Sequence, residues 1–357
     1  MTGVMTRIQA VDPLDPDGRQ LFEQWVGVHA AADDALWRGQ GGSWSADEVR
    51  ELQRATAGRR TSFAAVEDSG AVVGAVQVLE PLRDNLDRVH VWLSVRPDRW
   101  RQGIGSALLR TAENLAGAAE RSVINNRSSS PQESGGAGAA FARHHGYALA
   151  QEELRQELTL PLDPTTTDCA TTDRATTDPE ATDPDWRPDN CGEHPEYVIE
   201  TVWDTLPEEW LEDRAVLARR ISTDAPMGGL DLEEESWDAD RVREQWARGR
   251  AQGRRAVESV ARHLTSGRLV GFTDLLISAA TPNLGYQADT LVLREHRGHG
   301  LGAALKRASL VAVQRHQPQV RTVRTWNARS NEPMLRVNRE LGFVTTGYTQ
   351  EWQKRLG

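Results

Sequence analysis

The residues best suited to chemistry lie in a glycine-rich turn in the second half of the sequence, where Arg297 is followed by Gly298, Gly300 and Gly302. Glycine lets a backbone turn tightly and come close to a ligand, because it has no side chain. A helix that begins at such a turn has unpaired amides and a positive dipole end, which suit a pyrophosphate group. The segment therefore predicts an anion-binding turn, to which Arg297 or Arg294 would add a charge-assisted hydrogen bond.

Three other interpretations of this turn compete with that prediction. A dinucleotide-binding turn would need an acidic residue about twenty positions further on, and residues 319–330 contain no Asp or Glu. A P-loop would need Gly-Lys followed by Ser or Thr, which does not occur here. A glycine-rich helix start that binds nothing stays open on the turn alone.

The turn belongs to an internal repeat. Gly-Ile-Gly at 103–105 recurs as Gly-Leu-Gly at 300–302, an offset of 197 residues (from 103 to 300). Gly-Tyr at 146–147 recurs as Gly-Phe at 342–343, an offset of 196 residues (from 146 to 342). Because two landmarks keep the same separation within one residue, the chain is expected to use one fold twice.

Each half has the same pattern of elements around its turn. Two amphipathic helices are followed by two strands joined at Ser-Gly, a strand that runs into the glycine turn, a helix and a further strand. Each half then ends in a short helix, a Gly-aromatic pair and a last strand. The expected ranges are 19–30, 46–56, 62–67, 72–80, 88–95, 105–118, 122–126 and 153–160 in the first half, and 206–219, 239–252, 254–263, 269–278, 288–293, 302–316, 320–326 and 345–354 in the second. This order indicates an α/β fold, with a mixed, mostly antiparallel central sheet and helices on both faces in each half.

A segment rich in Thr, Asp and Pro separates the halves. Residues 163–190 have almost no apolar side chains, so they cannot bury enough surface to offset the entropy of ordering. We expect an N-terminal domain over 1–162, a linker over 163–194 and a C-terminal domain over 195–357. The 357 residues are too many for one compact core and suit two.

Composition narrows the class of protein. The net charge of −10 argues against a nucleic-acid partner and fits a cationic or amine-bearing substrate. Cys169 and Cys191 have no metal-ligand partner at short spacing, so they are expected to be incidental thiols and no metal site is expected. No run approaches the ~20 apolar residues of a membrane span, which favours a cytoplasmic protein without a membrane partner, either a monomer or a homodimer.

The turn also carries a family resemblance. Arg297 to Gly302 matches the Arg/Gln-x-x-Gly-x-Gly/Ala acyl-CoA pyrophosphate motif of the Gcn5-related N-acetyltransferases (GNATs), and residues 325–334, 337–338 and 341–343 resemble the family's next strand and helix. The combination resembles the C-terminal half of actinobacterial tandem members related to mycothiol synthase. The detailed match covers roughly 286–346, and the repeat extends it more loosely to most of the chain.

The resemblance implies an enzyme that moves an acetyl or other acyl group from acyl-CoA to a primary amine of a small molecule. The amine attacks the thioester directly, so no covalent enzyme intermediate and no metal are needed. The alternative is a non-catalytic acyl-CoA-binding or scaffold protein. The residues that the resemblance assigns to acyl-CoA in the second half are Leu291, Val292, Leu293, Arg297, Gly298, His299, Gly300, Leu301, Gly302, Ala303, Asn327 and Asn331.

Within that set, the amide of Val292 or Leu293 would hold the oxyanion. Asn331 suits either a pantetheine contact or a helix N-cap. Asp289 is the candidate general base, because burial on a strand would raise its pKa towards a useful range; the alternative is an edge carboxylate in solvent. Asn338 stands where many relatives have a proton-donating tyrosine, but an amide cannot act as an acid.

Other candidates stay open on the sequence. In place of that tyrosine, water or Tyr348 would protonate the leaving thiolate of CoA. His296, His299 and Glu295 are further candidates for the base. Carboxylates at 231–240 would attract a cationic amine, unless they only form a solvated helix start.

The first copy of the turn is weaker. Trp100 replaces the arginine of the motif, although Arg99 or Arg101 could compensate. This half either binds acyl-CoA or is a degenerate copy that supports the other half. If it binds, the matching residues are Val95, Gln102, Gly103, Ile104, Gly105 and Ser106.

Overall fold

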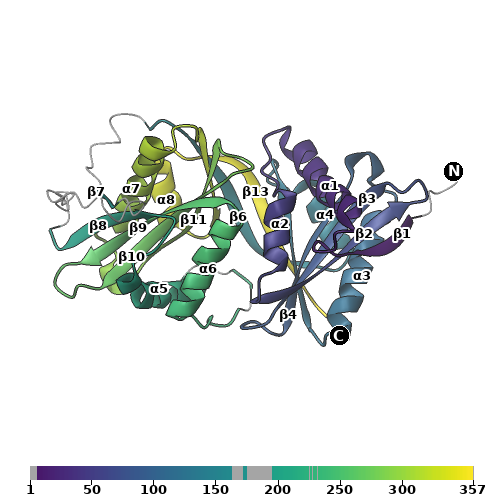
Figure 1. Ribbon diagram of the computed structural model, residues 1–357, viewed down its shortest axis with the longest axis horizontal. Helices are drawn as coiled ribbons and strands as arrows, with labels where there is room; N and C mark the ends of the chain where they lie inside the picture. The colour runs from purple at the N-terminus through teal and green to yellow at the C-terminus, as the bar shows by residue number, and fades with distance from the viewer. Residues whose placement is uncertain are drawn as a thin grey trace. The chain divides into compact units, whose positions relative to one another are not determined.

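The chain folds into two compact units in a computed structural model that describes residues 6–162, 172–174, 195–224, 226, 228–230 and 232–356 (Figure 1). The N-terminal unit comprises Met1–Glu152, Met227–Leu232 and Gly347–Gly357. The C-terminal unit comprises Glu153–Pro226 and Glu233–Thr346. None of the helices in the described ranges combines the length and apolar character that a membrane span requires.

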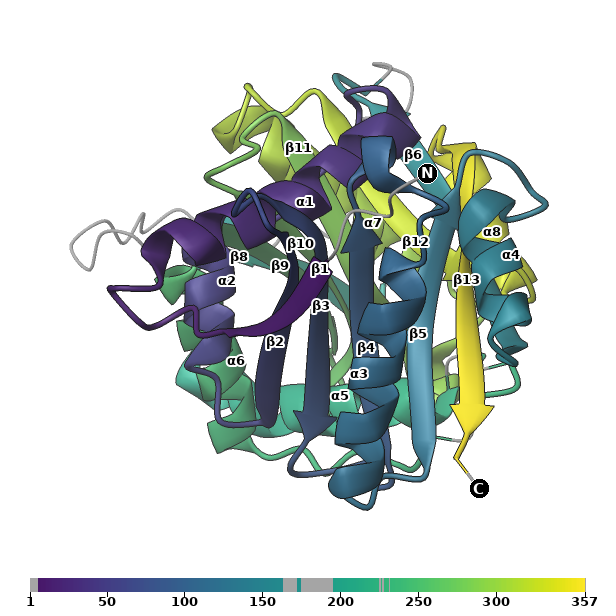
Figure 2. The same cartoon turned by 90° about the vertical axis from the view of Figure 1, so that its right-hand side faces the viewer.

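The N-terminal unit is a six-stranded sheet in the order β1-β2-β3-β4-β5-β13, and Figure 2 shows these strands side by side. All its pairs are antiparallel except β4–β5, which is parallel. Its strands are β1 (Thr6–Val11), β2 (Gly58–Glu67), β3 (Val72–Pro81), β4 (Arg88–Val95), β5 (Val123–Ser130) and β13 (Val344–Arg355). Its helices are α1 (Arg19–Trp37), α2 (Ala46–Gln53), α3 (Ile104–Ala118) and α4 (Gly136–His144).

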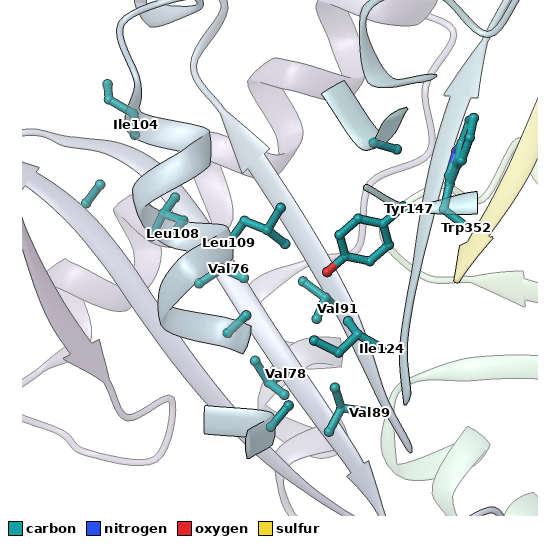
Figure 3. Packing of buried hydrophobic residues seen from close by; sticks show 14 of the residues in the cluster. Val76, Val78, Val89, Val91, Ile104, Leu108, Leu109, Ile124, Tyr147 and Trp352 are labelled. Atoms are coloured by element: carbon teal, nitrogen blue, oxygen red, sulfur yellow. The ribbon is translucent and has the colours of Figure 1, made fainter. Parts of the chain in front are cut away.

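The sheet of the N-terminal unit has a separate apolar core on each face. On one face, Leu108 and Leu109 of α3 pack with Val76 and Val78 of β3, as Figure 3 shows. On the other face, α1 and α2 pack against the same strands through a second cluster around Trp25. This alternation along β3 is the period of two that a strand between two helical layers requires.

The C-terminal unit repeats this plan with strand order β6-β12-β11-β10-β9-β8-β7. Its pairs are antiparallel except β11–β12 and β7–β8. The strands are β6 (Ala148–Thr159), β7 (Thr172–Arg174), β8 (Tyr197–Trp203), β9 (Arg254–His263), β10 (Leu269–Ser278), β11 (Leu284–Val292) and β12 (Thr322–Ala328). The helices are α5 (Leu211–Asp224) and α6 (Ala239–Ala251) on one face, and α7 (Leu301–His316) and α8 (Glu332–Glu340) on the other.

The predicted fold class, a mixed α/β sheet with helices on both faces in each half, is confirmed. Strands β1 and β8 were not predicted, and the helix expected to begin at 206 begins at Leu211, after a 3-10 turn at Glu208–Trp210. Of the expected linker 163–194, only the short strand β7 is described. Cys169 and Cys191 lie outside the described residues.

The last strand of each half pairs in the unit of the other half. Strand β13 pairs with β5 from Tyr348↔Ser130 to Arg355↔Val123, and β6 pairs with β12 from Thr322↔Thr159 to Ala328↔Glu153. The domains expected at 1–162 and 195–357 follow chain order, whereas the compact units follow these pairings. The difference arises because both last strands have the same pattern, so the sequence alone does not say which sheet each one completes.

This exchange predicts that Trp352→Ala destabilises the N-terminal unit, although residue 352 follows the whole C-terminal half in sequence. Trp352 is 1% exposed in the α3-face core, and its Nε1 donates to Ser128 Oγ at 2.9 Å. Removal of a buried tryptophan costs about 3–5 kcal/mol. Hydrogen exchange should show lost protection in β3, β4 and β5, while β9, β10 and β11 are unchanged. Val344→Ala, at a residue 61% exposed on the same strand, is the control. Loss of protection centred on β9–β11 would contradict the exchange.

Candidate functional site

Two parallel strands of the C-terminal unit separate part of the way along their length. Strands β11 and β12 pair only from Leu284↔Thr322 to Tyr286↔Arg324. Beyond that point β11 continues against β10 and β12 continues against β6. The facing edges of β11 and β12 therefore stop pairing with each other, which leaves main-chain donors and acceptors for another partner.

The glycine turn lies directly after β11. Gly298 and Gly300 have φ of +87° and +70°, a left-handed conformation that disfavours other residues. Helix α7 begins at Leu301, directly after its N-cap residue Gly300. No side-chain hydrogen bond caps its first amides. A Cβ atom added at Gly298 or Gly302 would meet nothing within 4 Å. The turn therefore has the predicted geometry and is not filled by side chains.

Arg297 is fixed beside the turn by two contacts. Its Nε donates to the carbonyl of Val292 at 2.9 Å, and one terminal nitrogen lies 2.8 Å from the Asp224 carboxylate. Arg294 reaches the same carboxylate at 3.2 Å. Asp224, whose side chain is buried, thus holds two partly exposed guanidinium groups next to the open glycines. This arrangement places positive charge where a phosphate would need it.

The strand pairing distinguishes the two predicted oxyanion donors. The amide of Leu293 donates to the carbonyl of Val270 at 2.9 Å. Amides of an antiparallel strand point alternately towards and away from the partner. The amide of Val292 therefore points away from β10, on the side where β12 has separated, and it is the better candidate of the two.

A β-bulge lies in β11 just before this position. Thr273 pairs with Thr290 but Leu275 pairs with Gln287, so Ala288 and Asp289 lie opposite the single residue Asp274. The amide of Asp289 donates to Asp274 Oδ1 at 2.9 Å. The bulge therefore turns the backbone of β11 and brings the two carboxylates together.

These residues form a ladder of three carboxylates across the sheet. Glu258 of β9 pairs with Asp274 of β10, which lies opposite Asp289 of β11. Arg214 of α5 donates from Nε to both oxygens of Glu258 at 3.0 Å. Glu258 and Asp274 are buried, whereas Asp289 is solvent-accessible. Buried charges carry a large desolvation cost. Here the charge of the Arg214 guanidinium opposes this cost for all three carboxylates.

The surroundings of the carboxylate ladder raise the pKa values of its three carboxyl groups. Burial raises the pKa of Asp274 well above its usual range, and the neighbouring charge of Asp289 raises it further. Desolvation by the surrounding protein also raises the pKa of Asp289, against the opposing effect of Arg214. Burial raises the pKa of Glu258, again against Arg214. The pair Asp274–Asp289 can therefore hold and release a proton nearer to neutrality than an isolated aspartate.

The prediction included Asp289 but missed Glu258, Asp274 and Arg214. A signal was present for Asp274, which interrupts a mostly apolar strand, whereas Glu258 lies in a strand with several other polar residues. Among the described residues, no three His, Cys, Asp or Glu side chains gather as a metal site would require.

Several other predicted residues have structural partners. Asn331 caps α8 by accepting from the amide of Met334, which is the second of its two predicted roles. The side chain of Asn327 donates to Thr325 Oγ1 at 3.5 Å. Leu291 and Leu301 are buried in cores, so only their main chain can reach a ligand. His299 and Ala303 are not fully buried, and His296 Nδ1 lies 2.9 Å from the Tyr197 hydroxyl.

Asn338 and Tyr348 lie in different units. Asn338 is completely buried in the C-terminal unit, where it bonds Lys306 and Gln156. Tyr348 pairs with Ser130 of β5 in the N-terminal unit. The strand that carries Tyr348 thus completes the sheet of the N-terminal unit, and a role of Tyr348 as proton donor stays a prediction.

Several of the carboxylates predicted at 231–240 have local partners. Asp238 caps α6, and its side chain accepts from the amide of Arg241. Glu235 accepts from the Trp237 indole and pairs with Arg241 at 3.2 Å. Asp231 lies outside the described residues. Charge from Glu235 also raises the pKa of Asp289.

The turn of the N-terminal unit has the same backbone conformation but different side chains around it. Arg101 and Gly103 have φ of +62° and +83°, as Gly298 and Gly300 do. A Cβ at Gly105 would lie 3.3 Å from the Phe141 ring, so this side chain covers the position that is open at Gly302. Ser106 Oγ lies 2.9 Å from His145 Nε2. The position of Gly105 is therefore covered by a side chain, whereas a Cβ at Gly103 would meet nothing within 4 Å.

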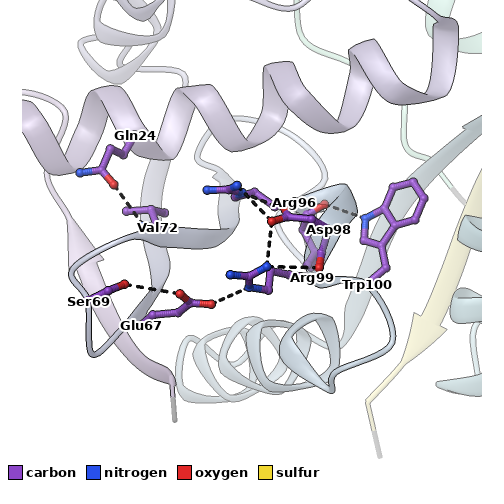
Figure 4. A network of polar contacts seen from close by, with 9 residues as sticks. Gln24, Glu67, Ser69, Val72, Arg96, Asp98, Arg99 and Trp100 are labelled. Carbon is purple, nitrogen blue, oxygen red and sulfur yellow. Dashed lines mark hydrogen bonds and ion pairs between the residues drawn. The ribbon is translucent and has the colours of Figure 1, made fainter. Parts of the chain in front are cut away.

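Trp100 takes over the structural contact of the missing arginine. Its indole donates to the carbonyl of Val95 at 2.7 Å, as Arg297 does to Val292. Figure 4 shows that Arg99 bonds Glu67 and Asp98 instead of standing free beside the turn. Gln102 is exposed, and Ile104 belongs to the core. The first turn thus keeps its shape without the guanidinium that the motif requires.

The carboxylate ladder is also absent from the N-terminal unit. Its equivalents are Ser62, Gln77 and Trp92, which pair in unbroken register, without a bulge in β4. Trp92 stacks on His29 with ring centroids 3.6 Å apart, and burial lowers the pKa of His29 to about 3. Ser62, Gln77, Trp92 and His29 are therefore uncharged near neutral pH.

Sequence comparison identifies the class to which this architecture belongs. A model of the acetyltransferase (GNAT) domain matches residues 59–149, and a model of the acetyltransferase (GNAT) family matches residues 216–343. The chain belongs to the GNAT family and carries two of its domains in tandem. The family is one of acyl transfer. Comparison with curated protein sequences finds no significant match.

Solved structures share the whole architecture. A tandem GNAT protein from the clavulanic acid biosynthesis pathway is 26% identical with a TM-score of 0.78, and the alignment covers 99% of both chains. A GCN5-related N-acetyltransferase from Sphaerobacter thermophilus is 17% identical with a TM-score of 0.64, covering 98% of this chain and 95% of that one. A GCN5-related glucosamine N-acetyltransferase region of a fungal multi-domain β-N-acetylglucosaminidase is 14% identical with a TM-score of 0.65, covering 99% and 38%.

Proposed function

We propose that the C-terminal unit is an acyl-CoA-dependent N-acetyltransferase whose acceptor is a primary amine of a small, cationic molecule. The observation that carries the proposal is the open turn at Gly298–Gly302 beside the separating strands β11 and β12. The unpaired amides of α7, with Arg297 next to them, suit the pyrophosphate of acyl-CoA. The relative from the clavulanic acid pathway supports a small molecule, not a protein, as acceptor.

The carboxylate ladder supports the cationic acceptor. An amine arrives largely as an ammonium ion and must lose a proton before it can attack. Asp289 is accessible at the end of the ladder, and its coupling to Asp274 behind it raises the pKa at which the pair holds a proton. In this proposal Asp289 takes the proton, the neutral amine attacks the thioester carbonyl, and the Val292 amide donates to the oxyanion.

Calorimetric titration with acetyl-CoA tests the proposal. We expect one equivalent to bind, because Phe141 covers the turn of the N-terminal unit. CoA release should then be measured with a panel of small primary amines, some of which carry a second cationic group and some of which do not. Preference for dications supports the ladder as the acceptor site. Absence of acetyl-CoA binding would overturn the proposal.

A non-catalytic role is favoured only for the N-terminal unit. Phe141 beside Gly105, Trp100 in place of the arginine, and the uncharged side chains of Ser62, Gln77 and Trp92 support this assignment. That unit is therefore proposed to be the degenerate copy, which supports the other. Binding of two equivalents of acetyl-CoA in the titration would contradict this assignment.

A further inference from the structure

A buried carboxylate at the end of α5 holds the two arginines that flank the glycine turn. Asp224 is the last residue of α5, and its side chain is 6% exposed. Its Oδ1 lies 3.2 Å from Arg294 Nε, and its Oδ2 lies 2.8 Å from a terminal nitrogen of Arg297. Each guanidinium group thus takes one carboxylate oxygen. We call these three residues the Asp224 clamp.

The position of Asp224 is unfavourable for a carboxylate in two ways. The C-terminal end of a helix carries the negative end of its dipole, which disfavours a negative side chain there. Burial of the carboxylate adds a desolvation cost. The two guanidinium contacts offset these costs, but an uncharged residue would avoid them altogether. Helix stability therefore does not explain an aspartate at this position.

The duplicated turn shows that the clamp is not needed for the backbone conformation either. At the repeat offset of 197 residues, Arg294 and Arg297 correspond to Pro97 and Trp100. The N-terminal turn has neither arginine, yet Gly103 has a φ of +83°, close to the +70° of Gly300. A helix begins directly after each of these glycines. The turn therefore forms without the two arginines, so its shape does not account for them.

Both guanidinium groups of the clamp are accessible, although the carboxylate between them is covered. The side chains of Arg294 and Arg297 are 70% and 45% exposed. A guanidinium group has five N–H donors. The contacts of Arg297 with the Val292 carbonyl and with Asp224 use one donor on Nε and one on a terminal nitrogen. The other donors can therefore bind an anion beside the open turn.

Fixing the arginines in advance favours the binding of an anionic ligand. A free arginine side chain loses rotamer freedom when it binds a phosphate, and that loss weakens binding. Asp224 imposes this loss during folding, before a ligand arrives. Its own charge has the opposite effect, because it repels phosphate, but water and salt screen that repulsion at a partly exposed site. The ordering effect is not screened, so we expect it to be the larger of the two.

We infer that Asp224 is a positioning residue for the diphosphate of acyl-CoA, and that it holds Arg294 and Arg297 ready to donate to the phosphate groups. The inference rests on the proposed function. It adds Arg294, which lies outside the Arg-x-x-Gly-x-Gly motif, as a second arginine for the diphosphate. It also adds a residue that raises cofactor affinity through two other side chains and not by its own contact with the cofactor.

The direction of one change in affinity tests this inference. Asp224→Asn keeps the shape of the side chain but removes the charge that holds both arginines. The dissociation constant of acetyl-CoA, measured by calorimetric titration, should therefore rise about tenfold. If Asp224 acted only by repelling phosphate, the same variant would bind acetyl-CoA more tightly than the parent. Equal or tighter binding would overturn the inference.

The other end of α5 provides a matched control. Asp213 is also buried, and it pairs at 2.5 Å with Arg268, whose side chain is 64% exposed. It lies 11 residues before Asp224 (from 213 to 224), which is about 16 Å along the helix. Asp213→Asn should keep the dissociation constant within about twofold of the parent value, because a charge this far away is screened. A loss as large as that of Asp224→Asn would mean that any change to α5 weakens binding, and the positioning role would be rejected.

A variant at the exposed arginine keeps the test independent of folding. Arg294→Gln changes a side chain that is 70% exposed, so it should melt like the parent. Its dissociation constant for acetyl-CoA should rise about fivefold, because one charge-assisted donor is lost. Arg268→Gln is the control for this variant and should bind like the parent. If Arg294→Gln binds acetyl-CoA as tightly as the parent does, the inference fails and the proposed function still stands.

A combined variant separates action through the arginines from direct action. In a protein that already carries Arg294→Gln and Arg297→Gln, Asp224→Asn should cause no further loss of affinity. The titration should be done at low ionic strength, where weakened binding of an anion is easier to measure. A further tenfold loss would show that Asp224 does not act through the arginines. If the parent itself binds no acetyl-CoA, the proposed function fails.

Discussion

Gly302→Trp should abolish acetyl-CoA binding, with the dissociation constant rising on the order of 100-fold or more. Gly302 lies in the first turn of α7, and a Cβ there would meet nothing within 4 Å. The fold should therefore accept the indole, which would occupy the space proposed for the pyrophosphate. Loss of even one or two charge-assisted bonds, at about 1.5–3 kcal/mol each, accounts for that change. Calorimetric titration and a melting curve on the same sample measure both effects.

The matched control is Gly249→Trp. Gly249 also lies in a helix of the C-terminal unit, and its Cβ position is open in the same way. This variant should bind acetyl-CoA like the parent. Gly300→Trp is a poorer test, because the φ of +70° at Gly300 would strain any side chain. Unchanged affinity in Gly302→Trp would place the cofactor elsewhere in the chain.

The two copies have the same backbone plan but differ in the charged side chains that it carries. Both have the left-handed turn and the strands that separate. The C-terminal copy adds charge at three places: Arg297 at the turn, the carboxylate ladder on the α5 face and Lys306 on the α7 face. The N-terminal copy has Trp100, Gln77 and Leu109 at corresponding positions. The loss of charge there reduces the desolvation cost of that copy.

The sequence predicted the turn well because local residues determine it. Left-handed φ values at Gly298 and Gly300 follow from glycine itself, and the helix after them follows from the apolar spacing. The roles of the turn residues towards acyl-CoA stay predictions. Fold class was equally accessible, since two copies of one pattern limit the possible arrangements.

What the sequence could not supply depends on register between distant strands. Asp274 and Asp289 meet only because β11 has one extra residue there, and no local pattern marks that bulge. Arg214 reaches Glu258 from a helix 44 residues away. The strand exchange is also non-local, because β6 and β13 have similar lengths and either could complete either sheet.

Asp289→Asn should lower kcat/KM for acyl transfer by about 10²–10⁴-fold, the usual contribution of a general base. The base works only when ionised, so parent activity should fall as pH falls through the raised pKa of Asp289. The asparagine variant should lose that dependence on pH. Asp274→Asn should leave the pH of this fall nearly unchanged, because burial keeps the Asp274 carboxyl protonated while Asp289 titrates.

As pH rises through this range, activity should increase, whereas the free energy of unfolding should decrease. A carboxyl whose pKa is raised by folding destabilises the folded state once pH exceeds its unfolded value, and the penalty is complete above the folded value. Asp274→Asn should therefore raise the melting temperature at pH 8 and have little effect at pH 3, while Asn Oδ1 can still accept from the Asp289 amide. Equal activity of parent and Asp289→Asn across this range would exclude Asp289 as the base, and Glu295 or His296 would be tested next.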